Sequence, residues 1–190
     1  MRIISGNLKG RKLYPLKGRS VRPTSDHLKE SIYNILSTRI TGSVVLDLFA
    51  GTGALGIEAL SRGAKFAVFL DNSKDAISVI NRNIKACALE EKSTAIRWNV
   101  KTNLNCINSY RPAFNLIFMD PPYNNHFLEP ALKNISHHVH IANDYFIIIE
   151  HSLLEPVPVL QSYFSMVDQR RYGKTLVSFL KYDIKKDSHI

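Results

Sequence analysis

The chain has 190 residues, of which 45% are hydrophobic and 22% are charged. This length fits one domain with a substantial core, and the composition is that of an ordinary globular protein, which argues against a disordered or collagen-like chain. The formal net charge is +9. Such an excess of Lys and Arg favours a polyanionic partner, but it also suits a basic protein that binds none.

The cysteines and the apolar runs bear on the cellular location of the protein. Cys87 and Cys106 do not form a CxxC pair, so neither a disulfide framework nor a zinc knuckle is expected, and a reducing cytoplasm is the default location. The N-terminal MRIISGNLKG lacks the apolar region of a secretory signal, and no apolar run approaches the length that spans a bilayer. We therefore expect a cytoplasmic protein with no membrane partner.

The first segment, 1–22, is strongly basic. It contains no acid and seven basic residues: Arg2, Lys9, Arg11, Lys12, Lys17, Arg19 and Arg22. Its glycines and Pro15 predict turns and extended backbone, not a helix. We divide the chain into a basic N-terminal arm, 1–22, and a main domain, 23–190. The arm either contacts a polyanion or packs on the sheet with its charges solvated.

A helix follows the arm. It is predicted over 25–39, because four apolar residues fall on one helical face: Leu28, Ile32, Ile35 and Leu36. Thr24, Ser25 or Asp26 can cap its first turn, and Gly42 lies just beyond its end.

From there, apolar runs that predict strands alternate with helical patterns. Strands are predicted at 44–49, 66–71, 93–98, 114–120 and 145–151. Helices are predicted at 53–62, 74–88 and 127–136, with a short helix or turn at 101–109. Two last strands, 164–173 and 175–183, are joined by a turn at Gly173. The pattern predicts an α/β fold with a parallel sheet covered on both faces and an antiparallel hairpin at one edge.

A glycine loop, Asp47–Gly56 with the sequence DLFAGTGALG, follows the first predicted strand and opens a helix. Its GxGxxG spacing, with Asp71 after the second strand, fits either NAD or S-adenosylmethionine. Asp47 favours S-adenosylmethionine, because a carboxylate repels a pyrophosphate but attracts an ammonium and a sulfonium. The glycines let the backbone approach the ligand closely.

We therefore predict an S-adenosylmethionine site. Its candidate residues are Asp47, Phe49, Ala50, Gly51, Gly53, Asp71, Asn72 and Asn99. Asp71 is assigned to the ribose hydroxyls, and Asn99, after the third strand, to the adenine ring. The competing interpretations are a helix N-cap for Asp71 and a turn residue for Asn99, while Asn72 and Ser73 can also cap the following helix.

The fourth predicted strand ends in Asp120, Pro121, Pro122 and Tyr123, which we assign as the catalytic tetrapeptide. In a doubly wound sheet this position lies beside the glycine loop. The Asp120 carboxylate and the Pro121 carbonyl can accept hydrogen bonds from an amine and bias its nitrogen toward tetrahedral geometry. Tyr123 offers a ring face for stacking an extruded base, so Tyr123→Phe is expected to be mild. The alternative is a rigid turn without chemistry.

Three further segments carry a resemblance to a known family. They are ISGNLKGRKL (4–13), RPTSDHLKESIYNIL (22–36) and FAGTGALGIEALSRGA (49–64). Together with Asp47–Gly53 and Asp120–Tyr123, which are typical of class I amino-methyltransferases, they make nearly the whole chain similar to the RsmD family. The resemblance is weakest over 100–112 and after 155. Tyr123 stands where some relatives carry Phe, which preserves stacking.

The resemblance implies a Rossmann-like class I methyltransferase fold, with a mostly parallel seven-stranded sheet and a basic N-terminal extension. It implies methyl transfer from S-adenosylmethionine to the N2 amine of a guanine in small-subunit (16S) ribosomal RNA. The implied partner is 16S rRNA, within a 30S subunit or an assembly intermediate. The candidate RNA contacts are then Lys9, Arg11, Lys12, Arg22 and Tyr123.

Other functions stay open at this point. An adenine-N6 DNA methyltransferase would use the same tetrapeptide, but such enzymes usually carry a target-recognition domain, for which this chain has little room. A methyltransferase for protein side-chain amides fits the basic arm less well. A cofactor-free RNA-binding module is disfavoured by Asp47, Asp71 and Asp120, and a nicotinamide oxidoreductase is the remaining class. His137, His138 and His140 lack a partner at metal-binding spacing, so no metal is expected.

Overall fold

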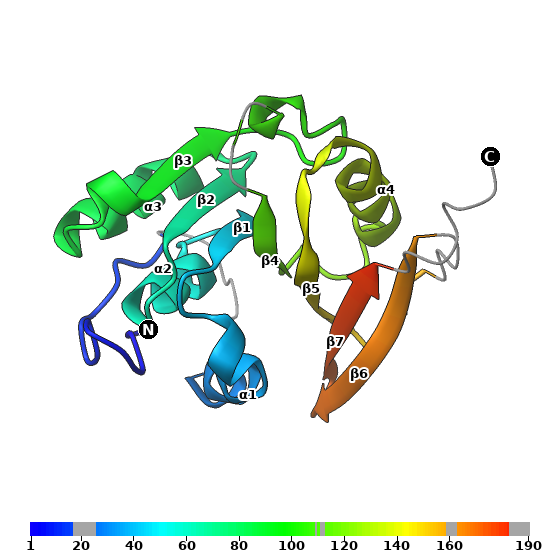
Figure 1. Ribbon diagram of the computed structural model, residues 1–190, viewed down its shortest axis with the longest axis horizontal. Coiled ribbons are helices and arrows are strands. Elements are labelled where there is room, and N and C mark those ends of the chain that lie inside the picture. The colour runs from blue at the N-terminus through cyan, green and yellow to red at the C-terminus, as the bar shows by residue number, and fades with distance from the viewer. Residues whose placement is uncertain (17–25, 109, 111–112, 159–162, 183–190) are drawn as a thin grey trace.

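The computed structural model describes residues 1–16, 26–108, 110, 113–158 and 163–182 (Figure 1). Several sequence predictions fall outside these ranges. They are the RNA contact Arg22, the arm's boundary at 22, and the caps Thr24 and Ser25.

One seven-stranded sheet organises the fold. Its strands are β1 (Val44–Leu48), β2 (Phe66–Asp71), β3 (Ser93–Arg97), β4 (Phe114–Met119), β5 (Ile141–Ser152), β6 (Phe164–Tyr172) and β7 (Thr175–Tyr182). The spatial order is β3-β2-β1-β4-β5-β7-β6. The first five strands run parallel, and β7 pairs antiparallel with both β5 and β6. This confirms the predicted α/β class, and the strand order reverses at β1, where such sheets bind ligands.

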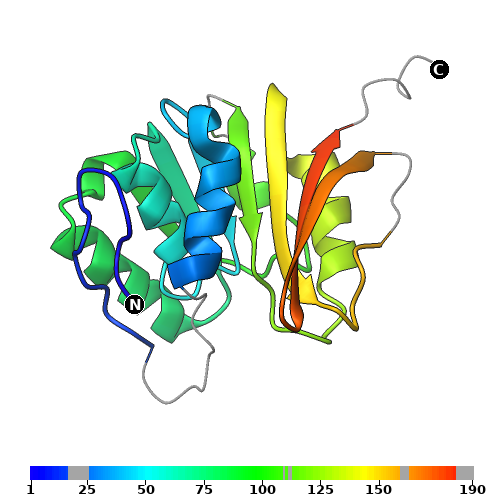
Figure 2. The ribbon, with the colours of Figure 1, turned by 90° about the horizontal axis from the view of Figure 1, so that it is seen from below.

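Helices cover both faces of the sheet (Figures 1 and 2). On one face, α1 (Asp26–Leu36), α2 (Ala54–Ser61) and α3 (Lys74–Ala86) pack on alternate strand residues such as Val45 and Phe69. On the other, α4 (Leu128–His138) packs on the intervening residues, such as Leu46 and Ile117. Short 3-10 turns occur at Ser37–Arg39, Glu90–Lys92 and Asn105–Ile107. Each strand at the centre is therefore apolar on both faces, as buried parallel strands are.

The start of β5 differs from the sequence prediction. The strand begins at Ile141, four residues before the predicted start at 145. Residues 141–144 (IAND) do not form an apolar run, but Ile141 pairs with Phe114, and the Phe114 N–H donates to the His140 carbonyl at 2.9 Å. A bulge follows between Phe114 and Leu116. Backbone pairing with a neighbouring strand, which no local pattern reports, extends β5 here.

The described part of the arm forms a small hairpin docked on α2 and α3 (Figure 2, blue). Arg2 and Lys12 form an antiparallel bridge, and the side chains of Ile3 and Leu13 are buried in the core. The Ile4 and Ser5 N–H groups donate to the Glu58 carboxylate at 2.8 and 3.0 Å. The arm backbone thus belongs to the fold, as in the packing interpretation, although it packs on helices and not on the sheet itself.

Glu58, on α2, links the arm to α1 and to the end of α2. Its side chain is fully buried, and its Oε1 accepts a hydrogen bond from Arg62 Nε at 2.8 Å. Lys29, on α1, is also fully buried and lies 3.8 Å from Glu58 Oε2, while its Nζ donates to the Arg2 carbonyl at 2.6 Å. Burial lowers the pKa of Lys29, and the nearby Glu58 and Asp26 carboxylates oppose that change. Such a buried ionic group is sensitive to the loss of any one member.

In the described ranges, no helix combines the length and apolar character needed to cross a membrane.

Substitutions at two glycines of the arm, Gly6 and Gly10, can measure how tightly the arm packs on α2. Gly6 and Gly10 have φ values of +78° and +83°, but only at Gly6 does an added Cβ meet an atom, the Ser61 carbonyl oxygen at 1.9 Å. We expect Gly10→Ala to cost about 1 kcal/mol through backbone strain alone. Gly6→Ala should cost at least about 2 kcal/mol more, because the hairpin must separate from α2. Chemical denaturation of both variants measures this difference, and equal losses would show that the arm is not docked as described.

Candidate active site

The ends of four parallel strands bring the candidate residues into one row. Leu70, Leu48, Met119 and Ile149 are aligned across β2, β1, β4 and β5. The residues that follow them are Asp71, Phe49, Asp120 and Glu150. Parallel strands present their carboxyl ends at one edge, so the glycine loop and the tetrapeptide meet there, as predicted.

The glycine loop is fastened to the end of β2. The Ala50 N–H donates to the Leu70 carbonyl at 3.0 Å, and the Gly51 N–H donates to Asp71 Oδ2 at 2.9 Å. Gly51 and Gly53 have φ values of +56° and +77°, which favour glycine. A Cβ on Gly51 would meet nothing nearer than the Phe49 carbonyl at 3.9 Å. The backbone at Gly51 is therefore open to close approach by a ligand.

The third glycine of the motif serves packing. A Cβ on Gly56 would lie 2.3 Å from a ring carbon of Phe69 and 3.2 Å from Asp47 Oδ2. Only glycine lets α2 approach the sheet this closely.

Asp47 lies beneath α2, with its side chain almost completely buried. Its Oδ2 accepts a hydrogen bond from the Gly56 N–H at 2.9 Å. Burial raises the pKa of Asp47 to about 8; the Gly56 N–H opposes this change, and Asp71 adds to it. The carboxyl group thus supports the loop from below, at a place where its negative charge is costly until a cation offsets it.

Asp71 has a structural role beside any ligand contact. Besides the bond from Gly51, its Oδ1 accepts a hydrogen bond from the Ser73 N–H at 2.8 Å. Ser73, not Asp71 or Asn72, caps α3, since its hydroxyl accepts a bond from the Ala76 N–H. Asn72 has an exposed side chain and a carbonyl that accepts from Arg97 Nε at 3.1 Å.

Asn99 forms the turn that follows β3. Its Oδ1 accepts a hydrogen bond from the Lys101 N–H at 3.1 Å, and its side chain is largely exposed. This is the geometry of the turn interpretation, and the exposed amide also leaves Asn99 accessible to a ligand.

The tetrapeptide lies between β4 and α4. Pro121 is buried, Pro122 is exposed, and Asp120 and Tyr123 are half-buried. The Tyr123 hydroxyl donates to Glu150 Oε1 at 2.9 Å and lies 3.2 Å from Thr175 Oγ1. Burial, together with the Glu150 and Asp120 carboxylates, raises the pKa of Tyr123, so the phenol stays protonated.

Two side chains that were not predicted, those of Phe127 and Lys101, lie beside these loops. The Phe49 and Phe127 rings meet edge to face at 5.3 Å, and Lys101 Nζ lies 3.9 Å from the centre of the Phe127 ring. Lys101 Nζ also donates to the Asn125 carbonyl at 3.5 Å. These contacts join the segments that follow β1, β3 and β4.

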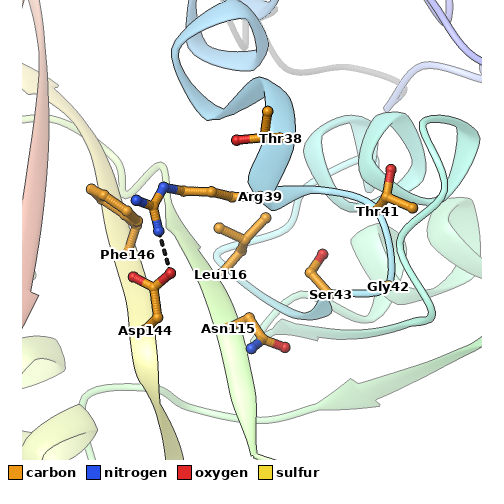
Figure 3. Close-up of a pocket in the computed structure, with 9 residues that line it drawn as sticks. All are labelled: Thr38, Arg39, Thr41, Gly42, Ser43, Asn115, Leu116, Asp144 and Phe146. Carbon is orange, nitrogen blue, oxygen red and sulfur yellow. Dashed lines mark hydrogen bonds and ion pairs between the residues drawn. The ribbon is translucent and has the colours of Figure 1, made fainter.

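A pocket of about 420 Å³ lies at the opposite, amino edge of the sheet (Figure 3). Ser43 precedes β1, and Asn115 and Asp144 lie in the first half of β4 and β5. Arg39, which also lines the pocket, is paired with Asp144 and packs on the Phe146 ring. None of the candidate residues lines this pocket, so it is separate from the row described above.

No group of three or more His, Cys, Asp or Glu side chains able to hold a metal occurs among the described residues.

Comparison with known proteins assigns the chain to a family. The family described as Conserved hypothetical protein 95 matches residues 1–181. The chain belongs to this family. The match agrees with the RsmD resemblance of the sequence motifs, because its relatives include the ribosomal RNA small subunit methyltransferase D proteins of Buchnera aphidicola and Escherichia coli.

The relatives cover most of the chain. YlbH of Bacillus subtilis is 38% identical over 181 residues, which are 95% of this chain and 98% of that protein. The Buchnera aphidicola protein is 34% identical over 78% of this chain and 76% of its own length. The solved structure of YhhF from Escherichia coli is 25% identical, has a TM-score of 0.82 and covers 96% of this chain and 98% of its own. Fold and relatives together make this chain a methyltransferase.

Sequence reasoning missed Glu150, Thr175, Lys101 and Phe127. Glu150 had a signal, because it is an acid that ends an apolar run, as Asp71 and Asp120 do. The other three had none, since their neighbours in space are distant in sequence.

The pKa of Asp47 makes a prediction about stability. The folded protein binds this proton more tightly than the unfolded chain. The stabilising contribution of protonated Asp47 is therefore fully present below pH 3.8, the ordinary pKa of the group, and is lost as the pH rises to about 8. Asp47→Asn keeps an acceptor for the Gly56 N–H and has no proton to lose in this pH range. The wild type should therefore lose stability relative to this variant as the pH rises from about 5 to about 8. Denaturant unfolding across this range measures it; parallel curves would contradict the assigned pKa.

Proposed function

We propose that this methyltransferase transfers a methyl group from S-adenosylmethionine to the exocyclic N2 amine of a guanine in 16S ribosomal RNA. The observation that carries the proposal is the row at the carboxyl edge, where Asp71 and the glycine loop lie beside Asp120 and Tyr123. Relatives named ribosomal RNA small subunit methyltransferase D support the RNA substrate. The 30S subunit or an assembly intermediate is the proposed context.

The residues at this edge fit S-adenosylmethionine. Its ammonium and sulfonium are cations, and the edge gathers the carboxyl groups of Asp47, Asp71 and Asp120 in a protein with a net charge of +9. The glycine loop offers backbone that a ligand can approach, and Asp71 is suited to ribose hydroxyls. Phe49, Ala50, Asn72 and Asn99 would complete the site. The bound cofactor supplies a methyl group on a positively charged sulfur, which is ready for attack by a nucleophile.

The tetrapeptide is proposed to hold the amine. The Asp120 carboxylate and the Pro121 carbonyl accept hydrogen bonds from the two N–H groups, which frees the nitrogen lone pair from the ring. The attacking amine loses a proton that becomes acidic on methylation, so Asp120 need not be a strong base. Tyr123 stacks on the base, which stabilises its extruded position by about 1–3 kcal/mol.

Adenine-N6 methylation of DNA is the alternative chemistry at the same tetrapeptide. Relatives named ribosomal RNA small subunit methyltransferase D favour RNA over DNA as the substrate.

The proposal is tested by methyl transfer from labelled S-adenosylmethionine to 16S rRNA and 30S particles, followed by analysis of the modified nucleoside. N2-methylguanosine is expected. Asp120→Ala should lower the rate by about a hundredfold or more, because positioning and electrostatics supply most of the rate. It should leave cofactor affinity, measured by calorimetry, nearly intact. Binding of NAD but not S-adenosylmethionine, or N6-methyladenosine as product, would refute the proposal.

The arm is proposed to contact RNA phosphates. Lys9, Arg11 and Lys12 have exposed side chains on the docked hairpin. Arg11 also has a structural contact, because its Nη1 donates to the Ala86 carbonyl at 2.6 Å. Only Lys9 and Lys12 can therefore be changed without removing a bond that docks the arm; Arg22 stays a proposed contact.

Salt dependence separates RNA contact from a purely structural arm. Each phosphate contact contributes about 0.7–0.9 to the slope of log affinity against log salt. Lys9→Gln with Lys12→Gln should flatten that slope by about 1.5 and leave thermal stability unchanged. Lys133→Gln on α4, across the sheet, is the matched control and should leave the slope unaltered. The measurement is RNA affinity at several salt concentrations for the wild type and the variants. An unchanged slope in the double variant would mean that the arm has a structural role and does not contact RNA phosphates.

A further inference from the structure

The Tyr123 hydroxyl is held at two points by neighbouring strands. It donates to Glu150 Oε1 at 2.9 Å and lies 3.2 Å from Thr175 Oγ1. Glu150 lies near the end of β5, and Thr175 begins β7, paired with Ser152. Stacking on a base uses the ring face and does not need the hydroxyl. The two contacts of the hydroxyl therefore affect the orientation of the Tyr123 ring.

The backbone after Tyr123 is fastened to the same edge. Asn124 has a φ of 57°, which is strained for a residue other than glycine, and its N–H donates to Glu155 Oε2 at 2.5 Å. His151 ties this segment to β7, since its Nδ1 lies 2.9 Å from the Glu155 carbonyl and its Nε2 lies 2.8 Å from Ser178 Oγ. Strained backbone persists where its surroundings fix it. The loop that carries the tetrapeptide is thus held by carboxylates of β5 and the turn after it.

Glu150 is suited to an anchor. Its side chain is 8% exposed, and a carboxylate at this depth is costly unless it accepts hydrogen bonds. Because the pKa of Tyr123 is raised by burial and by nearby carboxylates, the phenol remains a donor at physiological pH. The Tyr123 hydroxyl therefore donates and the Glu150 carboxylate accepts in this hydrogen bond.

We propose that Glu150, assisted by Thr175, is a positioning residue that sets the angle of the Tyr123 ring for capture of the target base. This inference rests on the proposed function of Tyr123 as the stacking residue. Glu150 acts through the Tyr123 hydroxyl and does not touch the base. Tyr123→Phe, which the sequence alone predicts to be mild, is then costly in this chain, because it removes the contact that orients the ring.

A double-mutant cycle tests the proposal. Tyr123→Phe and Glu150→Ala should each lower kcat by about tenfold, since a small misplacement at a reacting group is enough for such a loss. The double variant should be no slower than either single variant, because both remove the same contact. Glu150→Gln keeps an oxygen that accepts from the hydroxyl and should stay within about threefold of the wild type. Cofactor affinity should be unchanged in all four variants. Tyr172→Phe, on β6, is the control and should leave the rate unchanged.

Two results would overturn it. One is additive losses in the double variant, which would mean that Glu150 acts independently of the hydroxyl. The other is a Glu150→Gln variant as slow as Glu150→Ala, which would mean that the charge acts on the substrate.

Hydrogen exchange provides a readout that needs no catalysis. Amides of residues 123–127 should exchange faster in Tyr123→Phe and in Glu150→Ala than in the wild type, and unaltered exchange would overturn the anchor. A wild type without methyl transfer to RNA would refute the proposed function, and the exchange result would still decide the role of Glu150.

Discussion

A common register across four parallel strands determines where every candidate catalytic group lies. Leu70, Leu48, Met119 and Ile149 stand side by side, so the residues after them leave the sheet at one edge. A slip of one residue would turn each strand's side chains to the opposite face and move buried apolar groups into solvent. The packing on both faces of the sheet therefore fixes the geometry of the site, and the loops only complete it.

This geometry also separates charges of opposite sign. The carboxyl groups of Asp47, Asp71 and Asp120 gather at the edge, whereas basic residues are concentrated in the arm. A cation and a polyanion can then bind to different parts of one small protein without competing. Burial, with a smaller contribution from the nearby Asp71 carboxylate, raises the pKa of Asp47, so the negative charge of this group is costly in the free protein. In the proposed function, a bound cation would offset this cost.

The sequence predicts the order and type of the main helices and strands because their apolar periods are strong. It also places Asp71 and Asp120 correctly at one edge, because each acid ends an apolar run. It does not predict the early start of β5 at Ile141, which depends on pairing with Phe114. Nor does it predict the Tyr123 contacts, since Thr175 is 52 residues away along the chain. Contacts between distant segments depend on register and twist, which local patterns do not encode.

The basic arm is part of the scaffold of the protein, and this bears on its proposed role in RNA binding. Its basic composition suggests a loose appendage, but Glu58 accepts two of its N–H groups and Lys29 donates to the Arg2 carbonyl. These bonds and the buried Ile3 and Leu13 hold the hairpin on the helices that flank the glycine loop. Exposed lysines on a docked hairpin keep a fixed position relative to the carboxyl edge. In the proposed function, RNA that binds these lysines would not have to order a flexible tail, so the rigid arm would hold the RNA at a lower entropic cost and in a fixed position relative to Asp120.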